Sequence, residues 1–173
     1  QLDDQPDPVA PGGPCYPVRC TLVTTIFLLR EIELAGAVVA DLSLDHELME
    51  VTWNLAASKT DPRALGIART LGCLCSIESL PCPFHLILRR RNWLTSLSAA
   101  LGAPLDELPV CPTGSGAICT RESMVLAFEA LAARCEQPLL SPAGLRLVGG
   151  HSARVTGARA LAACGLDVDK IRI

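Results

Sequence analysis

The sequence predicts an α+β fold that is mainly α-helical and carries a small antiparallel β-sheet. Four stretches have apolar residues at helical spacing, and two short runs rich in Val, Leu and Trp lie close enough together to form a hairpin. Half of the 173 residues are hydrophobic and 19% are charged, so the chain can bury a core. This length suits one domain rather than two full-sized ones.

The first half of the chain predicts a loop, a helix and three strands. Residues 1–20 hold five of the thirteen prolines and are assigned to a Pro-rich linker or flexible segment. Residues 21–37 carry apolar side chains at helical spacing and predict one buried helix. Two apolar runs, 38–44 and 50–56, flank a polar stretch and predict a β-hairpin. A third short strand is expected at 67–70.

The second half predicts three longer helices. The first covers Pro83–Leu101. The second covers Thr120–Cys135 and begins with a hydroxyl side chain that can cap the backbone. The third covers His151–Cys164 and ends at Gly165, where a left-handed residue is easily accommodated. Asp167 is expected to cap a further helix.

Composition and charge exclude several classes of protein. The net charge of −3 divides into −7 for residues 1–50 (nine acids, two bases) and +4 for the remainder (nine acids, thirteen bases). This basic excess is well short of the stripe expected of a stand-alone nucleic-acid binder, and charge alone does not decide the partner. Aromatic residues make up 3%, too few for a platform that stacks single-stranded bases. No apolar run approaches a membrane span, and the acidic N-terminus lacks the regions of a signal peptide. We therefore expect an intracellular protein with reduced cysteines, not secreted and without a membrane partner, and the initial Gln indicates a fragment or processed product.

The stretch GGHSARVTGARALAACGLD, residues 149–167, is the most informative motif. His151 and Arg154 are three residues apart at a predicted helix start, so their side chains project from one face. Unpaired N–H groups and the helix dipole favour an anion at this end. The two side chains could therefore clamp a phosphate, one of them able to move a proton. The alternative is a solvated polar turn.

This motif resembles the second conserved box of the tyrosine recombinases, the phage-integrase family, in which H-x-x-R precedes a helix of small residues. The family's first box has an Arg in a helix and a Glu three positions later, and FLLREIEL is similar, with Arg30 and Glu33 in the matching places. A hairpin Lys follows that box in the family, and Lys59 in VTWNLAASKTD matches it. Taken singly, Arg30 could pair with Glu33 or Glu31 on a helix surface, and Lys59 could be solvated; the joint order of the three elements carries the resemblance.

The resemblance implies that residues 21–173 are a partial tyrosine recombinase catalytic domain with the fold of DNA breaking–rejoining enzymes, incomplete at the C-terminus. Such enzymes perform site-specific DNA recombination or integration through a phosphotyrosine intermediate, with no cofactor required for catalysis. By family analogy Arg30 and Arg154 clamp the phosphate, Lys59 is the general acid and His151 assists proton transfer. The implied partners are duplex DNA and other recombinase protomers, which points to a mobile element and to a DNA-associated or nuclear location.

The sequence departs from the family at the nucleophile. Its only tyrosine, Tyr16, precedes Arg30, whereas the family's nucleophile follows the second box. The further His or Trp expected between that box and the tyrosine is missing as well. We therefore expect this chain to be inactive in strand cleavage by itself. The alternatives are a non-catalytic mobile-element remnant with residual DNA binding, and a zinc-stapled helical interaction module.

Three thiols and one imidazole lie close together in the sequence. They belong to Cys73, Cys75, Cys82 and His85. This set could close a tetrahedral site for a structural Zn²⁺, although a single residue between the first two cysteines is fewer than zinc sites usually have. Unpaired structural cysteines are the alternative.

Three consecutive arginines form a further candidate site. Arg89, Arg90 and Arg91 are expected on the exposed side of the helix at 83–101. Together with Trp93 they could follow a DNA backbone, since phosphate contacts supply most sequence-independent affinity. The alternative is a solvated helix face.

Overall fold

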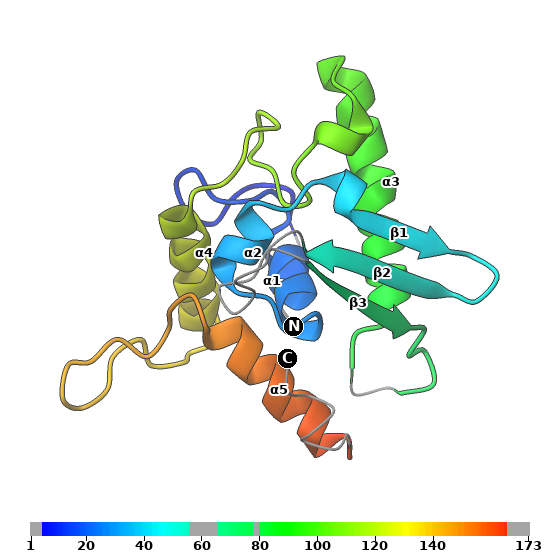
Figure 1. The fold of residues 1–173 in the computed structure, drawn as a ribbon. Helices are drawn as coiled ribbons and strands as arrows, with labels where there is room; N and C mark the ends of the chain where they lie inside the picture. Colours follow the sequence, from blue (N-terminus) through cyan, green and yellow to red (C-terminus); the bar gives the residue numbers. More distant parts are fainter. Residues whose placement is uncertain (1–4, 56–65, 78–79, 166–173) are drawn as a thin grey trace.

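The computed structural model describes residues 5–55, 66–77 and 80–165. Its mixed α+β fold confirms the predicted class, with helix α1 at the centre and a small sheet beside it (Figure 1). In chain order the elements are α1 (Pro17–Ile26), α2 (Glu31–Ala35), the 3₁₀ turn η1 (Val39–Asp41), β1 (Leu42–Asp45), β2 (Glu50–Leu55), β3 (Ile67–Gly72), α3 (Pro83–Leu101), the 3₁₀ turn η2 (Leu105–Glu107), α4 (Arg121–Arg134) and α5 (Ser152–Ala163).

The sheet is antiparallel throughout, in the order β1-β2-β3. Trp53 of β2 lies opposite Leu42 on one side and Arg69 of β3 on the other. Alternate residues of β2, namely Val51, Trp53 and Leu55, are buried, as period-two patterning requires. The predicted hairpin and third strand are therefore confirmed, although the first strand begins at Leu42 because residues 39–41 of its predicted range form η1.

The single helix predicted over 21–37 is wrong, because the chain leaves the helix after Ile26 and re-enters it at Glu31. Leu28 adopts a left-handed conformation with φ 53°. It and its neighbours Phe27 and Leu29 are 5%, 1% and 0% exposed. Three consecutive residues of a helix project about 100° apart and cannot all face one core. Breaking the helix allows all three to be buried.

The Pro-rich N-terminal stretch belongs to the packed structure. Its last residues form the first turn of α1, which starts at Pro17 rather than at the expected Thr21. The Cys15 N–H donates to the Pro112 carbonyl at 2.9 Å, and Cys20 is fully buried. The later part of this stretch is therefore buried against the core, at Ala10, residues 13–15, Pro17 and Cys20, whereas residues 5–8 are exposed.

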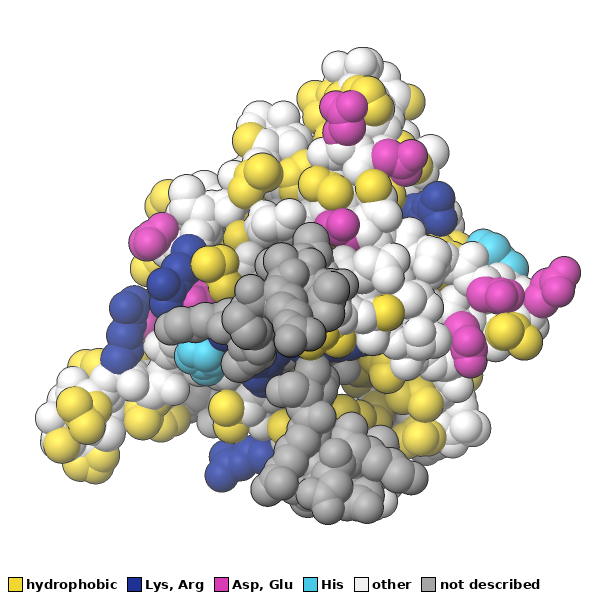
Figure 2. All heavy atoms as spheres, viewed as in Figure 1, with side chains coloured by type: hydrophobic (Ala, Val, Ile, Leu, Met, Phe, Trp, Pro, Cys, Tyr) yellow, Lys and Arg dark blue, Asp and Glu magenta, His cyan; other side chains and the backbone are white. Residues whose placement is uncertain are grey.

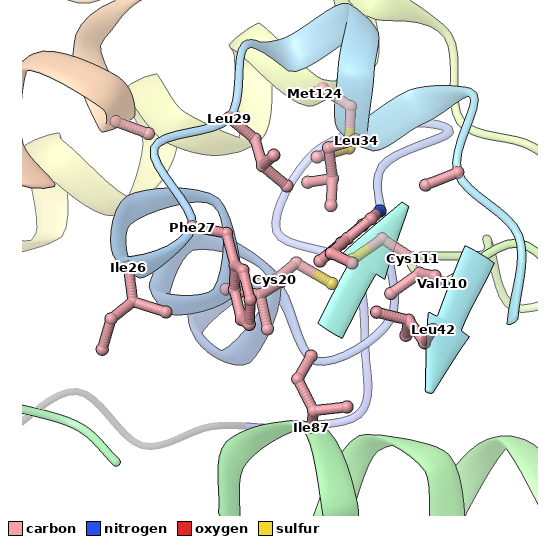
Figure 3. Close-up of a cluster of buried hydrophobic side chains, with 14 of the residues drawn as sticks. Cys20, Ile26, Phe27, Leu29, Leu34, Leu42, Ile87, Val110, Cys111 and Met124 are labelled. Carbon is pink, nitrogen blue, oxygen red and sulfur yellow. The ribbon is translucent and has the colours of Figure 1, made fainter. Parts of the chain in front are cut away.

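The main core lies between α1, β2 and α3. Phe27 and Trp53 meet edge to face with ring centroids 5.2 Å apart. Ile87 from α3 and Met124 from α4 point toward the same region from opposite sides (Figure 3). Helix α1 also packs against α4 and α5, so it fixes most of the molecule around itself.

The predicted helices of the second half are confirmed with small shifts in their ends. Thr120 caps α4, accepting the Ser123 N–H on its hydroxyl oxygen at 3.1 Å. Helix α5 ends before Gly165, which has φ +85°. The helix expected after Asp167 lies outside the described residues. No described helix has both the length and the apolar character that crossing a bilayer requires.

Candidate functional site

Helix α2 begins at a paired arginine and glutamate. The Glu33 carboxylate accepts the Arg30 backbone N–H on Oε2 at 2.7 Å and the guanidinium Nε–H on Oε1 at 3.1 Å. The Arg30 Nη2 atom also lies 2.9 Å from Oε1, and the two side chains are 13% and 4% exposed. Glu33 therefore caps α2 and orients the Arg30 guanidinium at the same time.

Arg154 reaches the same carboxylate from α5. Its Nη2 lies 3.3 Å from Glu33 Oε2, across 121 residues of sequence. Its Nε–H donates to the Leu28 carbonyl at 2.6 Å, so the helix break supplies a second anchor. The Arg154 side chain stays 25% exposed. The structure thus brings together Arg30 and Arg154, the two arginines that the sequence singled out.

A third arginine, which the sequence reasoning missed, lies behind these two. Arg69 of β3 is 9% exposed, and its Nη1 donates to the carbonyls of Phe27 and Leu28 at 2.5 and 3.1 Å. In register it lies opposite Trp53, on the inward face of the sheet. The available signal was an arginine at an inward position of a predicted strand, where an apolar residue is usual.

Arg30, Arg69 and Arg154, with Glu33, form what we call the arginine cluster. Burial lowers the pKa of Arg69 below its usual range, Glu33 opposes this shift, and the positive charges of Arg154 and Arg30 add to it. Arg30 and Arg154 pair with Glu33, and Arg69 shares the Leu28 carbonyl with Arg154, so three cations and one carboxylate leave the cluster with a net positive charge. Because Arg30 and Arg154 remain partly exposed, the cluster can bind an anion from solvent, and two guanidiniums suit a phosphate.

Close packing at Gly157 places α5 and therefore Arg154. A Cβ atom added there would lie 1.9 Å from the Thr25 carbonyl oxygen of α1 and 2.7 Å from a Leu28 methyl group. Only glycine permits this approach of the two backbones. The small residue three positions after Arg154 therefore lets α5 lie close to the helix break.

His151 occupies the N-cap of α5, and its side chain is exposed. Its carbonyl accepts the Val155 N–H at 3.0 Å. Within the described part of the chain, no hydrogen bond joins the His151 ring to the arginine cluster. His151 and Arg154 share the first turn of α5, as predicted, but only Arg154 contacts Glu33.

Lys59 falls in the connection between β2 and β3, outside the described residues. A cavity of about 180 Å³ lies beside Glu33 on the side of β2, and Asn54 and Leu55 at the end of that strand line it. The last described residues before the segment that contains Lys59 therefore lie close to Glu33.

The expectation that three consecutive arginines of α3 share an exposed face is wrong. Arg90 is fully buried, whereas Arg89 is exposed and Arg91 is half-buried. The Arg90 guanidinium donates to the carbonyls of Val110 at 2.7 Å and Cys15 at 3.0 Å, and it stacks over the Trp93 ring at 4.5 Å. Consecutive helical residues project in different directions, so only one of the three side chains faces the core.

The four residues of the predicted metal site do converge, and we call them the Cys/His cluster. Their ligand atoms all lie within 4.8 Å of one another, a set that could bind a metal ion. Burial raises the pKa of Cys82, but hydrogen bonds involving His85, Leu74 and Cys73 outweigh it and lower the pKa to about 6. Hydrogen bonds with Cys73 and Cys82 raise the pKa of Cys75 to about 11.

Two groups of polar residues therefore stand out, the arginine cluster and the Cys/His cluster. The first joins α2, β3 and α5; the second joins the end of β3 to the start of α3. No model of a known protein family matches this sequence, and no curated protein matches it either.

Proposed function

We propose that residues 21–173 are part of a tyrosine recombinase catalytic domain and that Arg30 and Arg154 bind one phosphate of duplex DNA. The observation that carries this proposal is the convergence of both guanidiniums on the buried Glu33 carboxylate from distant parts of the chain. Two arginines held in this way present donors to the non-bridging oxygens of a phosphodiester, where negative charge develops during attack.

The order of elements along the chain also supports the proposal. Arg30 is followed by an antiparallel hairpin, Lys59 falls between β2 and β3, and the H-x-x-R motif opens α5. In the family that this order resembles, the hairpin lysine is the general acid for the leaving 5′ oxygen. Lys59 would take that role here, with His151 assisting proton transfer at the attacking phenol.

Glu33 and Arg69 would act as positioning residues. Glu33 holds both guanidiniums, and its carboxylate offsets part of their mutual repulsion. Arg69 fixes the carbonyls of Phe27 and Leu28, and the Leu28 carbonyl in turn accepts the Arg154 Nε–H. The helix break therefore becomes a rigid support for the phosphate-binding side chains.

The residues assigned roles above do not include the tyrosine nucleophile that the family uses. Tyr16, the only tyrosine, precedes Arg30, packs edge to face on Trp93 with centroids 5.1 Å apart, and does not match the family's position. Strand cleavage would need a tyrosine from outside residues 1–173. Cleavage through a phosphotyrosine needs no metal, so an ion in the Cys/His cluster would serve the fold rather than the reaction.

Binding of the full chain to a fluorescently labelled duplex of mixed sequence, measured by anisotropy, tests the proposal. Arg30→Ala and Arg154→Ala should each weaken binding by roughly tenfold or more, since a hydrogen bond to a charged group contributes about 1.5–3 kcal/mol. Arg146→Ala is the matched control, because Arg146 also pairs with a glutamate, Glu129, but lies 60% exposed outside the cluster.

The control should bind nearly as tightly as the unmodified chain. Circular dichroism and thermal unfolding would verify that each variant is folded. Arg30→Lys or Arg154→Lys, which keeps the charge but loses the forked guanidinium, replaces the alanine variant at the same position if that one is not folded. Equal affinities for the cluster variants and the control would contradict the proposal.

A further inference from the structure

We propose that Cys73, Cys75, Cys82 and His85 bind one Zn²⁺ ion in a closed tetrahedral site, and that this ion joins the end of β3 to the start of α3. The inference is independent of DNA binding. It rests on the positions of the four ligand atoms, on the chemistry of the donors and on the slight burial of the described residues of the connecting segment.

The distances between ligand atoms are close to the edges of a zinc tetrahedron. Bond lengths of about 2.3 Å to sulfur and 2.0–2.1 Å to nitrogen imply S···S edges of about 3.8 Å and S···N edges of about 3.6 Å. The Sγ atoms of Cys73 and Cys82 are 3.5 Å apart. The Nδ1 atom of His85 lies 3.8, 3.2 and 3.2 Å from the Sγ atoms of Cys73, Cys75 and Cys82.

Hydrogen bonding alone does not explain this convergence. One ring nitrogen either donates a single proton or offers a single lone pair, so it can make one good hydrogen bond. Here three sulfurs surround the same Nδ1 atom of His85. A central ion that accepts a lone pair from each of the four atoms accounts for all the short distances together.

The local fold presents the ligands in the way a small zinc site requires. Cys82 is the N-cap of α3, Pro83 follows at the first helical position, and His85 lies in the first turn, so Cys82 and His85 occupy one side of the helix start. Cys73 follows the last residue of β3 directly. The Leu74 N–H donates to Cys82 Sγ at 3.3 Å, a backbone bond that stabilises a thiolate ligand.

The chemistry of the four ligand atoms indicates which metal they would bind. Three thiolates and one imidazole are soft and borderline ligands, which favour Zn²⁺ over Mg²⁺ or Ca²⁺. Four protein ligands complete the tetrahedron and leave no open position for water or substrate, which is typical of structural zinc sites. The ion would therefore hold elements together rather than take part in a reaction.

Burial contributes little to the described part of the segment between β3 and α3. None of the described residues in 73–77 and 80–82 is fully buried. The helix start itself matters to the fold, because Phe84 is 3% exposed and its ring meets that of His46, in the β1–β2 turn, at 5.6 Å. A zinc ion would tie this helix start to the segment before it, where no described residue is fully buried.

The full chain, purified under reducing conditions, should contain one zinc ion per molecule by elemental mass spectrometry. Replacing zinc by Co²⁺ should give the intense visible bands of a tetrahedral centre and a thiolate-to-cobalt charge-transfer band. Cys75→Ser is the most informative variant, because Cys75 is exposed and its loss leaves the core intact. It should abolish stoichiometric zinc and weaken the charge-transfer band.

Cys135→Ser is the matched control, since Cys135 is also exposed but lies at the end of α4. It should keep one zinc ion and the full cobalt spectrum. A folded chain that is metal-free and gives no thiolate–cobalt band would overturn the proposal. So would intact-mass evidence that Cys73 and Cys82 form a disulfide in the native protein, or equal zinc loss in the control.

Discussion

Burial separates two pairs of arginines that make specific contacts in this structure. Arg69 and Arg90 are buried and donate to backbone carbonyls, whereas Arg30 and Arg154 are partly exposed and share one carboxylate. A buried guanidinium holds segments together, and a partly exposed one remains accessible to a ligand. The sequence alone did not separate the two pairs, because which arginine faces the core depends on how α3 and β3 pack.

Arg90→Ala should destabilise the protein strongly. It removes the donors to the buried carbonyls of Val110 and Cys15, at about 1–3 kcal/mol for each group left unsatisfied. We expect a fall of roughly 3 kcal/mol in the free energy of unfolding, measured by urea denaturation. Arg89→Ala, one residue away and exposed, should change it by less than about 0.5 kcal/mol. Similar effects for the two variants would contradict the assigned role of Arg90.

The buried thiol of Cys119 should make stability depend on alkaline pH. Burial, aided by Cys20 and opposed by Arg90, raises the pKa of Cys119 to about 12 from a usual 9.0. Because the folded-state pKa is raised, this contribution to stability is fully present below pH 9 and is lost as the pH rises toward 12. Urea denaturation at successive pH values should show this decline.

Cys119→Ala is the comparison for that experiment. The variant should be less stable at neutral pH, since it removes a buried side chain, but its stability should fall less steeply over the same alkaline range. Parallel curves for the two proteins would show that Cys119 is not responsible.

At the scale of elements, local patterns predicted more than long-range packing did. The hairpin, the third strand and helices α3, α4 and α5 follow from periodicity and capping residues, and the Cys/His cluster follows from spacing, because its ligands span a short segment. The break between α1 and α2 did not, since an unbroken apolar run also fits a helix. Its cause is tertiary: Phe27, Leu28 and Leu29 all reach the core only if the helix ends.

The sequence likewise predicted part of the candidate site and missed part of it. Arg30 and Arg154 were found because the order of motifs resembles a known family. Arg69 was not found, since its role depends on the register of β3 against Trp53 and on the free carbonyls that the helix break leaves. Whether His151 takes part stays a prediction, as does the role of Lys59.

Gly157→Ala tests the contact between α1 and α5. The added Cβ would meet the Thr25 carbonyl oxygen at 1.9 Å, so α5 must move away from α1 and carry Arg154 with it. We expect a loss of about 1–3 kcal/mol in unfolding free energy, typical of overpacking, together with weaker DNA binding. Thermal unfolding and anisotropy measure the two effects.

Gly149→Ala is the control, because nothing lies within 4 Å of a Cβ atom at that position. It should leave both quantities nearly unchanged. If Gly157→Ala were as stable as the control, the close packing of α5 would not position Arg154.

For the whole molecule, charge is distributed unevenly. Residues 1–50 carry −7 and residues 51–173 carry +4, so the chain is acidic overall yet basic in its larger part. In the view of Figure 2, acidic side chains gather at the tip of the β1–β2 hairpin, although others lie elsewhere on this face, and most of the visible basic ones lie toward α4 and α5. If the chain binds DNA as we propose, the acidic hairpin tip should be turned away from the duplex.

The salt dependence of DNA binding should therefore reflect a small number of phosphate contacts. A plot of log K against log salt concentration has a slope of about −0.9 for each phosphate neutralised. Arg154→Ala should reduce the magnitude of that slope by about one. The same substitution with an unchanged slope would mean that Arg154 contacts no phosphate.

The central claim is that Arg30 and Arg154 act on the same phosphate. A double-mutant cycle in DNA-binding free energy, from Arg30→Ala, Arg154→Ala and the double variant, tests it most directly. Two side chains that hold one phosphate should be coupled by at least about 1 kcal/mol in binding free energy. The double variant should therefore bind only slightly less tightly than the single variant with the lower affinity. Losses that simply add, or no loss in either single variant, would contradict the claim.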